Sequence, residues 1–275
     1  MTAATKDAPL GVFDSGLGGL TVVRALRHAL PHEDIVYLGD SARLPYGTKG
    51  ADTVVKYAAS CGRHLVSHGV KAIVIACNTV SAVAIETLRI DLDLPVLGVI
   101  EPGARAAVAA SKTGRIGVLA TPSTIFSQAY TRAVTTLSTR TEVFGQAAPL
   151  LVPLAEEGWT EGEVPHLAAR RYLEPLARAG VDVIVLGCTH YPLFFSIIEE
   201  EAKKMIGDHV RIVDSATTVA TETGEFLKTR DLLAAPRSRT SDIRLFVTDV
   251  PRSFSEMARR FLVDEAVPEA EQIDL

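Results

Sequence analysis

Short runs of apolar residues, many of them β-branched, recur along the chain and alternate with longer amphipathic stretches. The runs predict buried strands at Leu10–Phe13, Ile35–Leu38, Ala72–Ala76, Val96–Val99, Ile116–Leu119, Val183–Leu186, Val210–Val213 and Leu245–Val247. Apolar residues at helical spacing predict helices at Leu20–Ala29, Thr53–Val66, Ser81–Arg89, Glu101–Ala110 and His166–Arg178. Alternating strands and helices indicate an α/β fold with mainly parallel sheets flanked by helices, in which ligands bind at the carboxyl ends of the strands.

The chain also resembles itself. Val70–Cys77 aligns with Val181–Cys188 at an offset of 111 residues, and Gly11–Ser15 aligns more weakly with Gly117–Thr121. Such a repeat predicts two similar α/β halves, each with one cysteine at the end of an equivalent strand. We therefore expect a first domain of residues 1–97 plus 210–275, with Asp14 and Cys77, and a second domain of residues 98–209, with Cys188 and His190.

Composition and charge narrow the class of protein. The 275 residues are 47% hydrophobic and 22% charged, which is typical of a soluble globular protein with one large domain or two moderate ones. The net charge is −5 and the basic residues are scattered, so no direct nucleic-acid site is expected. Met1–Pro9 has no apolar signal region, and no apolar run approaches the roughly 20 residues that span a bilayer. We expect a cytoplasmic protein that does not contact a membrane.

The last stretch of the chain, Val263–Leu275, is acidic and poorly patterned. We expect it to cap the fold or to fray.

Three cysteines are expected to remain free thiols in a reducing compartment. Cys77 ends a predicted strand just before a helix, where unpaired N–H groups and the helix dipole lower a thiol pKa. A lone cysteine is often just a small buried hydrophobe, but Cys188 recurs in the same setting, which favours chemistry at both. Cys61 lies inside a helical pattern, where burial suits it best.

The second cysteine is followed by further polar groups. Pro192 restricts its predecessor and can begin a helix, so Cys188, Thr189 and His190 are expected in a strand-to-helix turn that faces a cleft. His190 is then an adjacent proton partner, although a capping or core histidine is an alternative. Zinc held by Cys77, Cys188 and His190 is another alternative, which the lack of a close C-x-x-C or H-x-x-H pair disfavours.

Other strands also lead into candidate turns. In the glycine-rich turn after the first strand, Thr21 stands where the third glycine of a dinucleotide motif belongs, so a nucleotide site is disfavoured. Asp14 and Ser15 there predict an acid and a hydrogen-bond donor at the cleft rim, or a helix cap. Thr121 precedes a helix whose N–H groups could hold a carboxylate.

Two further segments have ordinary structural explanations. The turn Arg43–Gly47 is expected to expose its arginine and tyrosine, and tight turns alone account for its proline and glycine. Glu156 is by default a solvated surface charge.

Taken together, these motifs resemble bacterial glutamate racemases, of the aspartate/glutamate racemase family. The match runs in order from about Leu10 to Phe261 and is carried by Gly11–Thr21, Tyr37–Asp40, Pro45–Gly47, Cys77–Ala82, Leu151–Glu156 and Leu186–Leu193. The resemblance implies a two-domain enzyme whose active site lies in the cleft between the domains and which needs no pyridoxal phosphate, metal or other cofactor. The activity it implies is interconversion of L-glutamate and D-glutamate for peptidoglycan synthesis, and hence for cell-wall biogenesis and cell shape. We also expect a homodimer.

The resemblance further implies residue roles. Cys77 and Cys188 correspond to the two catalytic thiols, with Asp14 supporting the first and His190 the second. The groups that hold the substrate correspond to Ser15, Pro45, Tyr46, Gly47, Asn78, Thr79, Thr121 and Thr189. Glu156 matches a glutamate near the catalytic histidine.

Two opposed thiols suit inversion at an α-carbon. The α-proton is weakly acidic, so an enzyme needs a base on one face and an acid on the other, with donors for the carboxylate. A racemase for aspartate or another acid remains an alternative, as does a regulatory ligand-binding module whose cysteines are structural. Inhibition of DNA gyrase, reported for some glutamate racemases, is a second role that the resemblance permits.

Overall fold

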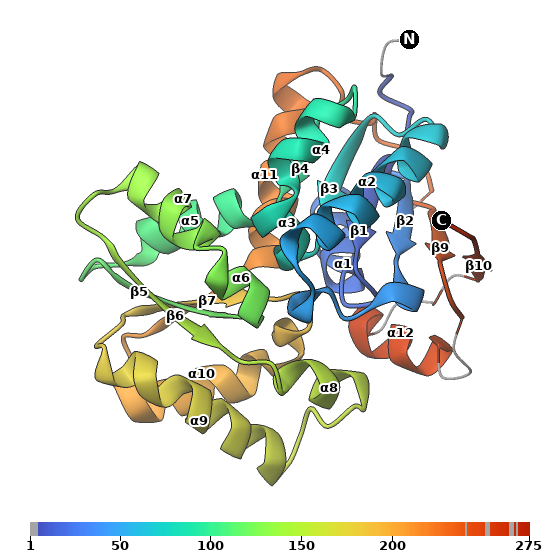
Figure 1. Cartoon of the computed structure of the whole chain (residues 1–275). Helices are drawn as coiled ribbons and strands as arrows, with labels where there is room; N and C mark the ends of the chain where they lie inside the picture. Colours follow the sequence, from blue (N-terminus) through green and yellow to red (C-terminus); the bar gives the residue numbers. More distant parts are fainter. Residues whose placement is uncertain (1–4, 240, 251–253, 264–266, 268) are drawn as a thin grey trace.

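Two parallel sheets form the framework of the chain (Figure 1). The computed structural model describes residues 5–239, 241–250, 254–263, 267 and 269–275. A six-stranded sheet has the order β10-β9-β2-β1-β3-β4, and a four-stranded sheet has the order β6-β5-β7-β8. The strands are β1 (Leu10–Asp14), β2 (Ile35–Gly39), β3 (Ala72–Ile75), β4 (Val96–Gly98), β5 (Arg115–Ala120), β6 (Glu142–Ala147), β7 (Val183–Gly187), β8 (Arg211–Asp214), β9 (Ile243–Val247) and β10 (Ala270–Gln272).

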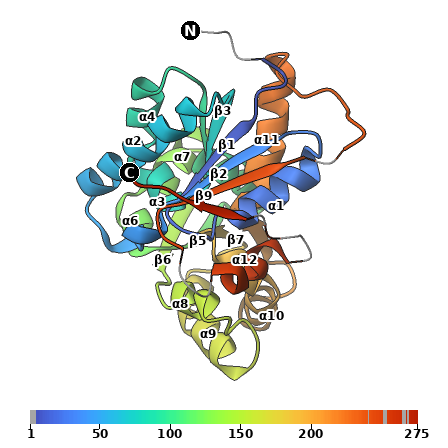
Figure 2. The same cartoon turned by 90° about the vertical axis from the view of Figure 1, so that its right-hand side faces the viewer.

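Helices cover both faces of each sheet (Figures 1 and 2). They are α1 (Leu20–Ala29), α2 (Ala51–Ser67), α3 (Asn78–Val83), α4 (Ile85–Asp91), α5 (Ile100–Ala110), α6 (Pro122–Phe126), α7 (Ala129–Leu137), α8 (Leu151–Glu156), α9 (Glu163–Arg178), α10 (Phe195–Ile206), α11 (Ser215–Thr229) and α12 (Phe254–Leu262), with 3₁₀ turns η1 (Ser41–Arg43), η2 (Tyr46–Thr48) and η3 (Tyr191–Phe194). On the larger sheet, α1 and α11 pack on one face and α2 and α4 on the other; on the smaller sheet, α5 and α7 oppose α9 and α10. The expected α/β fold with parallel sheets and flanking helices is confirmed.

The two sheets repeat one topology. The order β2-β1-β3-β4 in the larger sheet corresponds to β6-β5-β7-β8 in the smaller one, strand for strand. Cys77 follows β3 and Cys188 follows β7, which are equivalent strands in this scheme. The division at 97/98 and 209/210 stays a prediction; β8, which lies beyond residue 210, pairs with β7 in the smaller sheet.

All eight predicted strands are present, and two further strands occur where the sequence pattern is weak. β6 is an edge strand in which no residue is fully buried, so it lacks the continuous apolar run of the central strands. β10 is formed by the acidic C-terminal stretch and pairs in parallel with β9. Of the two alternatives for this stretch, capping or fraying, Ala270–Gln272 follow the first, because they cover the edge of the sheet; residues 264–266 and 268 lie outside the described part.

The helix predicted over Ser81–Arg89 is two helices in the structure. The chain leaves helical geometry at Ala84, whose φ is −118°, and α4 starts again at Ile85. The first of the two, α3, starts directly after Cys77 at Asn78. Both short helices pack against α2.

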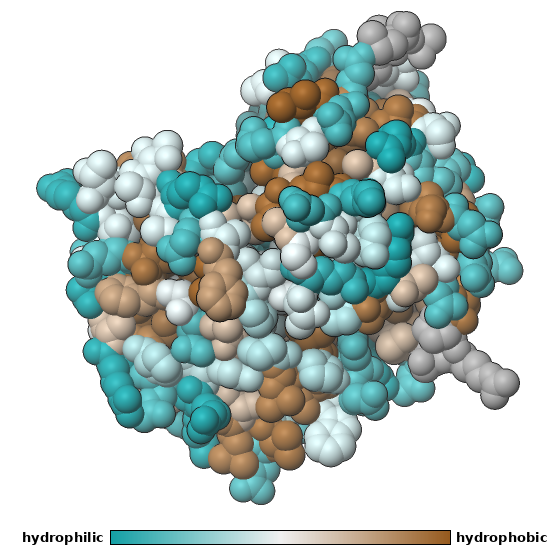
Figure 3. Space-filling view, viewed as in Figure 1, coloured by the Kyte–Doolittle hydropathy of each residue, from teal (hydrophilic) through white to brown (hydrophobic). Residues whose placement is uncertain are grey.

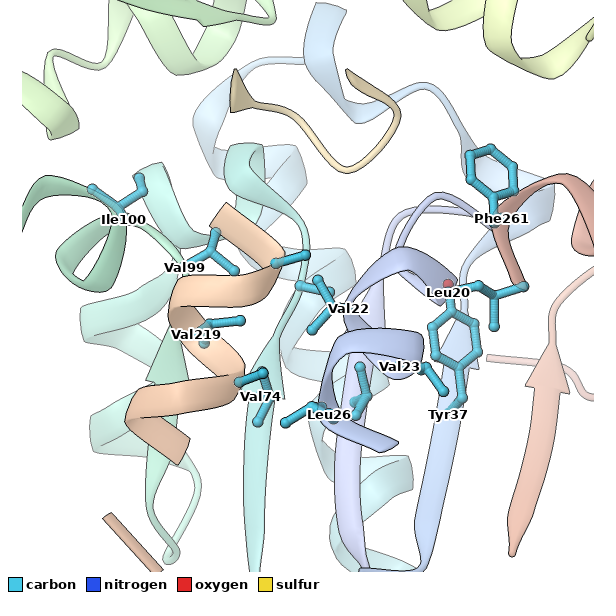
Figure 4. Packing of buried hydrophobic residues seen from close by; sticks show 14 of the residues in the cluster. Leu20, Val22, Val23, Leu26, Tyr37, Val74, Val99, Ile100, Val219 and Phe261 are labelled. Atoms are coloured by element: carbon cyan, nitrogen blue, oxygen red, sulfur yellow. The ribbon is translucent and has the colours of Figure 1, made fainter. Parts of the chain in front are cut away.

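A single apolar cluster joins the two halves. Helix α11 packs against α1 on one side and against α5 on the other, so Val219 of α11 shares a cluster with Val22 of α1 and Ala104 of α5. Figure 4 shows Val219 beside Val22, with Phe261 of α12 near Leu20 at the end of the same cluster. The relative position of the sheets is therefore fixed by helix packing as well as by the chain connections.

The surface mixes polar and apolar side chains, and Figure 3 shows apolar side chains gathered at the lower edge of the view. Among the described helices, none combines the length and the apolar character required to cross a bilayer.

A buried ion pair ties loops together at the amino-terminal edge of the larger sheet. Lys71 and Glu33 are almost fully buried, and their charged atoms lie 2.5 Å apart. Lys71 Nζ also donates to the carbonyls of Lys6 at 2.7 Å and Leu232 at 2.9 Å. Glu33 Oε1 accepts from the Ala234 N–H at 2.7 Å. The pair thus connects the start of β3 to three other segments.

Removing one partner leaves an uncompensated buried charge. We expect Lys71→Met to lower the free energy of unfolding by about 3–5 kcal/mol, measured by urea denaturation. The double variant Lys71→Met/Glu33→Leu removes both charges and should recover part of that loss. Equal stability of the single variant and the wild type would contradict the assigned role.

Candidate active site

The two cysteines occupy equivalent turns at the carboxyl ends of two central strands. Cys77 is the N-cap residue of α3, with one residue between it and the end of β3, and accepts at its carbonyl from the Ser81 N–H at 2.9 Å. Cys188 follows β7 and precedes η3, with its carbonyl accepting from the Tyr191 N–H at 3.1 Å. Both side chains are buried, at 5% and 6% exposure. Neither thiol is disulfide-bonded.

Both thiols line one cavity of about 130 Å³. Twelve of the thirteen residues predicted for the site contribute to its wall, from Ser15 after β1 to His190 after β7. Asp14 is the exception, because its side chain is fully buried behind the wall. Cavities for drug-sized ligands measure about 300–1,000 Å³, so this one suits a small ligand.

The sequence did not predict the apolar part of the wall. Leu44 contributes from the turn before η2, and Pro149, Val152 and Pro153 contribute from the start of α8. The motif Leu151–Glu156 pointed to this helix, but the side of it that faces the cavity depends on how α8 packs on η3.

Cys77 lies in an environment that favours the neutral thiol. Burial and then the negative charge of Asp14 raise the pKa of Cys77 to about 12, against smaller opposing effects of Ser15 and the Val80 N–H. The Sγ–Oγ distance to Ser15 is 3.5 Å. The expectation of a lowered thiol pKa is wrong here, because desolvation outweighs the short helix that the thiol caps.

Asp14 links the two strand-end turns. Its carboxylate accepts from the Gly16 N–H at 3.0 Å, and its other oxygen lies 3.5 Å from Thr189 Oγ1. Burial raises the pKa of Asp14, while the positive charge of His190 and three backbone N–H groups oppose the rise. Thr189 is bound again from the first half, since Thr21 Oγ1 donates to its carbonyl at 3.1 Å. The turn that carries Cys188 is therefore held by groups from the larger sheet.

Cys188, His190 and Glu156 form a chain of polar contacts. Cys188 Sγ lies 3.8 Å from His190 Nδ1, and His190 Nε2 lies 3.2 Å from Glu156 Oε1. Burial disfavours the imidazolium, but contacts with Cys188 and Glu156 outweigh it and raise the pKa of His190 to about 10. The default interpretation of Glu156 as a solvated surface charge is wrong, since its carboxylate contacts a buried histidine.

Hydroxyl and amide groups form the polar wall. Thr79 Oγ1 and Thr121 Oγ1 are 3.0 Å apart, and both lie within 3.4 Å of Thr124 Oγ1. Thr121 caps α6 and Thr124 lies one turn into it, a hydroxyl spacing that could have been noticed in the sequence. Asn78 Oδ1 accepts from Tyr130 at 2.8 Å, which fixes the orientation of its amide.

The turn at Tyr46 differs from expectation. The Tyr46 ring is 1% exposed, not solvent-facing, and its hydroxyl donates to Asp40. Burial is the main reason why the pKa of Tyr46 is raised. Gly47 has no room for a side chain, because a Cβ there would lie 2.9 Å from Thr121 Cβ. The phenol thus stabilises the turn, and the turn brings its backbone against the cavity.

The third cysteine, Cys61, belongs to helix α2. Cys61 is fully buried in α2, as predicted, and burial raises its pKa to about 12.

The zinc alternative requires three ligand atoms close together. Within the described residues, one group of His, Cys, Asp or Glu side chains brings three such atoms within 4.8 Å of one another, and it consists of His166, Glu200 and Glu201. Cys77, Cys188 and His190 do not meet that condition, so they do not form a compact zinc site.

Known proteins resemble this chain over nearly its whole length. A model of the family Asp/Glu/Hydantoin racemase matches residues 20–223. A glutamate racemase of Geobacter metallireducens is 50% identical over 92% of both chains. Among solved structures, a glutamate racemase isoform from Bacillus anthracis superposes with a TM-score of 0.90 at 36% identity, and one from Francisella tularensis, in complex with D-glutamate, with 0.88 at 37%; each comparison covers 98% of both chains.

The charge of Asp14 should control the reactivity of Cys77. We expect Asp14→Asn to lower the pKa of Cys77, since the anion that disfavours the thiolate is removed. Each unit by which that pKa falls raises the thiolate fraction about tenfold at neutral pH. Alkylation of Cys77 by iodoacetamide, followed by peptide mass spectrometry, should accelerate accordingly.

Cys61 is the internal control for this measurement. Its pKa is raised by burial and by Asp40, not by Asp14, so its alkylation rate should not change. An unchanged or slower rate at Cys77 would contradict the assigned effect of Asp14.

Proposed function

The chain belongs to the Asp/Glu/hydantoin racemase family, and on that premise we propose that it interconverts L-glutamate and D-glutamate by moving the α-proton between two thiols, without a cofactor. One observation carries the proposal: Cys77 and Cys188 come from equivalent turns of two sheets and line the same small cavity. Inversion at a carbon centre needs proton carriers on opposite faces, and two related halves supply one each.

Cys77 is proposed as the thiol that takes the α-proton of D-glutamate, and Cys188 as the one that takes it from L-glutamate. The enantiomer assigned to each thiol follows from the family resemblance. The raised pKa of Cys77 supports its role as a base, because a thiolate formed in that environment is a stronger base toward a weakly acidic C–H group. The fraction of Cys77 present as thiolate is low at neutral pH unless a positive charge binds nearby. The ammonium group of the substrate supplies that charge within the cavity.

His190 and Glu156 are proposed to assist proton transfer to and from Cys188. With a pKa near 10, His190 is an imidazolium at neutral pH and donates toward Cys188. That positive charge stabilises the Cys188 thiolate when this thiol acts as the base. Glu156, on the far side of the ring, keeps the imidazole oriented and charged.

The remaining polar wall is proposed to bind the two carboxylates and the ammonium group. Thr79, Thr121 and Asn78 offer hydroxyl and amide donors from the side of α3 and α6. Ser15 and Thr189 flank the two thiols and suit the α-carboxylate or the ammonium group. The family assignment of Pro45, Tyr46 and Gly47 is supported by their position in the wall. Use of D-glutamate for peptidoglycan, a homodimer and any effect on gyrase stay predictions from the resemblance.

Solvent labelling tests the reaction itself. A thiol exchanges its proton with water, so either enantiomer of glutamate incubated in heavy water should give the opposite enantiomer with deuterium at the α-carbon. Chiral chromatography with mass spectrometry measures the product, and D- and L-aspartate in the same assay define the substrate. Unlabelled product would exclude the two-thiol route.

Single cysteine variants test the two bases separately. Cys77→Ala and Cys188→Ala should each lower racemisation by about 10²- to 10⁴-fold, because inversion needs both groups. Cys77 alone should still exchange the α-proton of D-glutamate slowly, and Cys188 alone that of L-glutamate. Nuclear magnetic resonance of the α-position follows this exchange for each enantiomer.

Cys61→Ala is the matched control. Its thiol is fully buried in α2, so this variant should lose stability, as a lower melting temperature, but should racemise at the wild-type rate. Wild-type racemisation by either active-site variant would refute the roles proposed for the thiols.

A further inference from the structure

Helix α12 connects the C-terminal part of the chain to the catalytic histidine. It lies between the larger sheet and the pair α8 and α10, as both cartoon views show (Figures 1 and 2). Its residue Phe261 is fully buried and meets the His190 ring edge to face, with centroids 5.2 Å apart and an interplanar angle of 83°. The ring of His190 is thus bounded on one side by an aromatic group from the first half of the molecule.

The end of α8 requires a partner that the helix itself does not provide. Trp159 N–H bonds to the Leu154 carbonyl at 2.8 Å and Gly158 N–H to the Ala155 carbonyl at 3.1 Å. With Gly158 at a φ of +78°, this is a Schellman motif, which satisfies two of the last carbonyls. The Glu156 carbonyl takes part in neither bond.

Arg260 supplies the missing donor. Its guanidinium donates to the Glu156 carbonyl. It also donates to the carboxylate of Glu256, one turn earlier on α12, with 2.7 Å between Nη2 and Oε1. A Cβ at Gly158 would lie 2.8 Å from Arg260 Cζ, so the glycine also makes room for the guanidinium. A cation at the carboxyl end of a helix is favourable for the helix dipole as well.

We infer that Arg260 and Phe261 are positioning residues for the His190–Glu156 pair. One fixes the backbone of Glu156 and the other packs on the ring of His190, so consecutive residues of α12 hold both members of the contact at 3.2 Å. Neither residue lines the cavity, so neither touches substrate. The inference rests on the proposed function only for its effect on rate.

The charged and polar groups around His190 determine how its pKa should respond when Arg260 no longer binds the end of α8. They are the carboxylates of Glu156 and Asp14 and the thiol of Cys188. Arg260 binds the main-chain carbonyl of Glu156 and not its carboxylate, and its own ion pair is with Glu256. If the end of α8 is released, Glu156 moves away from the imidazole. Less negative charge near the ring disfavours the imidazolium, so the pKa of His190 falls.

The experiment compares Arg260→Ala with Arg259→Ala. Arg259 is the preceding residue on the same helix, carries the same charge and is exposed, so it controls for loss of charge. In Arg260→Ala we expect the pKa of His190, titrated by histidine-labelled NMR, to fall from about 10, and kcat/KM for glutamate to fall about tenfold. The basic limb of the kcat/KM profile should move to lower pH by the same amount. Arg259→Ala should match the wild type in all three.

Arg260→Lys is the milder variant. It retains a cation at the end of α8 without the guanidinium fork, and it should give intermediate values even if the alanine variant folds poorly. A lower melting temperature with an unchanged His190 pKa and unchanged kcat/KM, in either variant, would overturn the inference and leave Arg260 a purely structural residue.

The titration does not require turnover, so it separates the two proposals. If the wild type fails to racemise glutamate, the proposed function fails, while the NMR titration still decides whether Arg260 positions the pair.

Discussion

The carboxyl ends of β3 and β7 converge on one buried cavity, and this convergence governs how the two halves of the molecule pack. Parallel strands place the turns that follow them at one edge of a sheet, and the repeat of one strand order in both sheets makes these two turns equivalent. Each turn carries a cysteine. The helices that join the halves must hold the two edges facing each other, since neither sheet alone encloses the cavity.

Direct contacts between the halves meet this requirement at the site itself. Thr189, after β7, is bound at its carbonyl by Thr21 of α1, and its hydroxyl lies near Asp14 at the end of β1. Farther out, α11 packs between α1 and α5, so the apolar residues on one face of each sheet form one shared cluster, while the other face of each sheet has a cluster of its own. At the opposite side, α12 reaches α8 and His190. The thiol turns are therefore held from three directions.

Burial opposes charge on both sides of the cavity, but neighbouring groups make the outcome different on each side. It opposes charge on Cys77, where the nearby carboxylate of Asp14 acts in the same direction and the thiol stays protonated. It also opposes charge on His190, but there the contacts with Cys188 and Glu156 prevail and the ring becomes cationic. One half thus offers a strongly basic thiolate and the other a thiol beside a cation, which is an asymmetry that the repeat in sequence does not reveal.

The class of fold, the central strands and the internal repeat could be predicted from the sequence, because continuous apolar runs are local properties of the chain. Nearly every polar residue of the wall could be named as well, through the motifs that resemble glutamate racemases. The sequence did not determine β6 and β10, since edge strands have too little burial to leave a clear pattern. The high pKa of Cys77 was decided only by tertiary structure, because desolvation and the charge of Asp14 come from residues far apart in sequence. The hydrogen bond from Arg260 to the Glu156 carbonyl was likewise decided by tertiary structure, because the two residues lie 104 positions apart. Sequence patterns report which face of an element is apolar, whereas pKa values and long-range contacts depend on distances that exist only after the elements have packed.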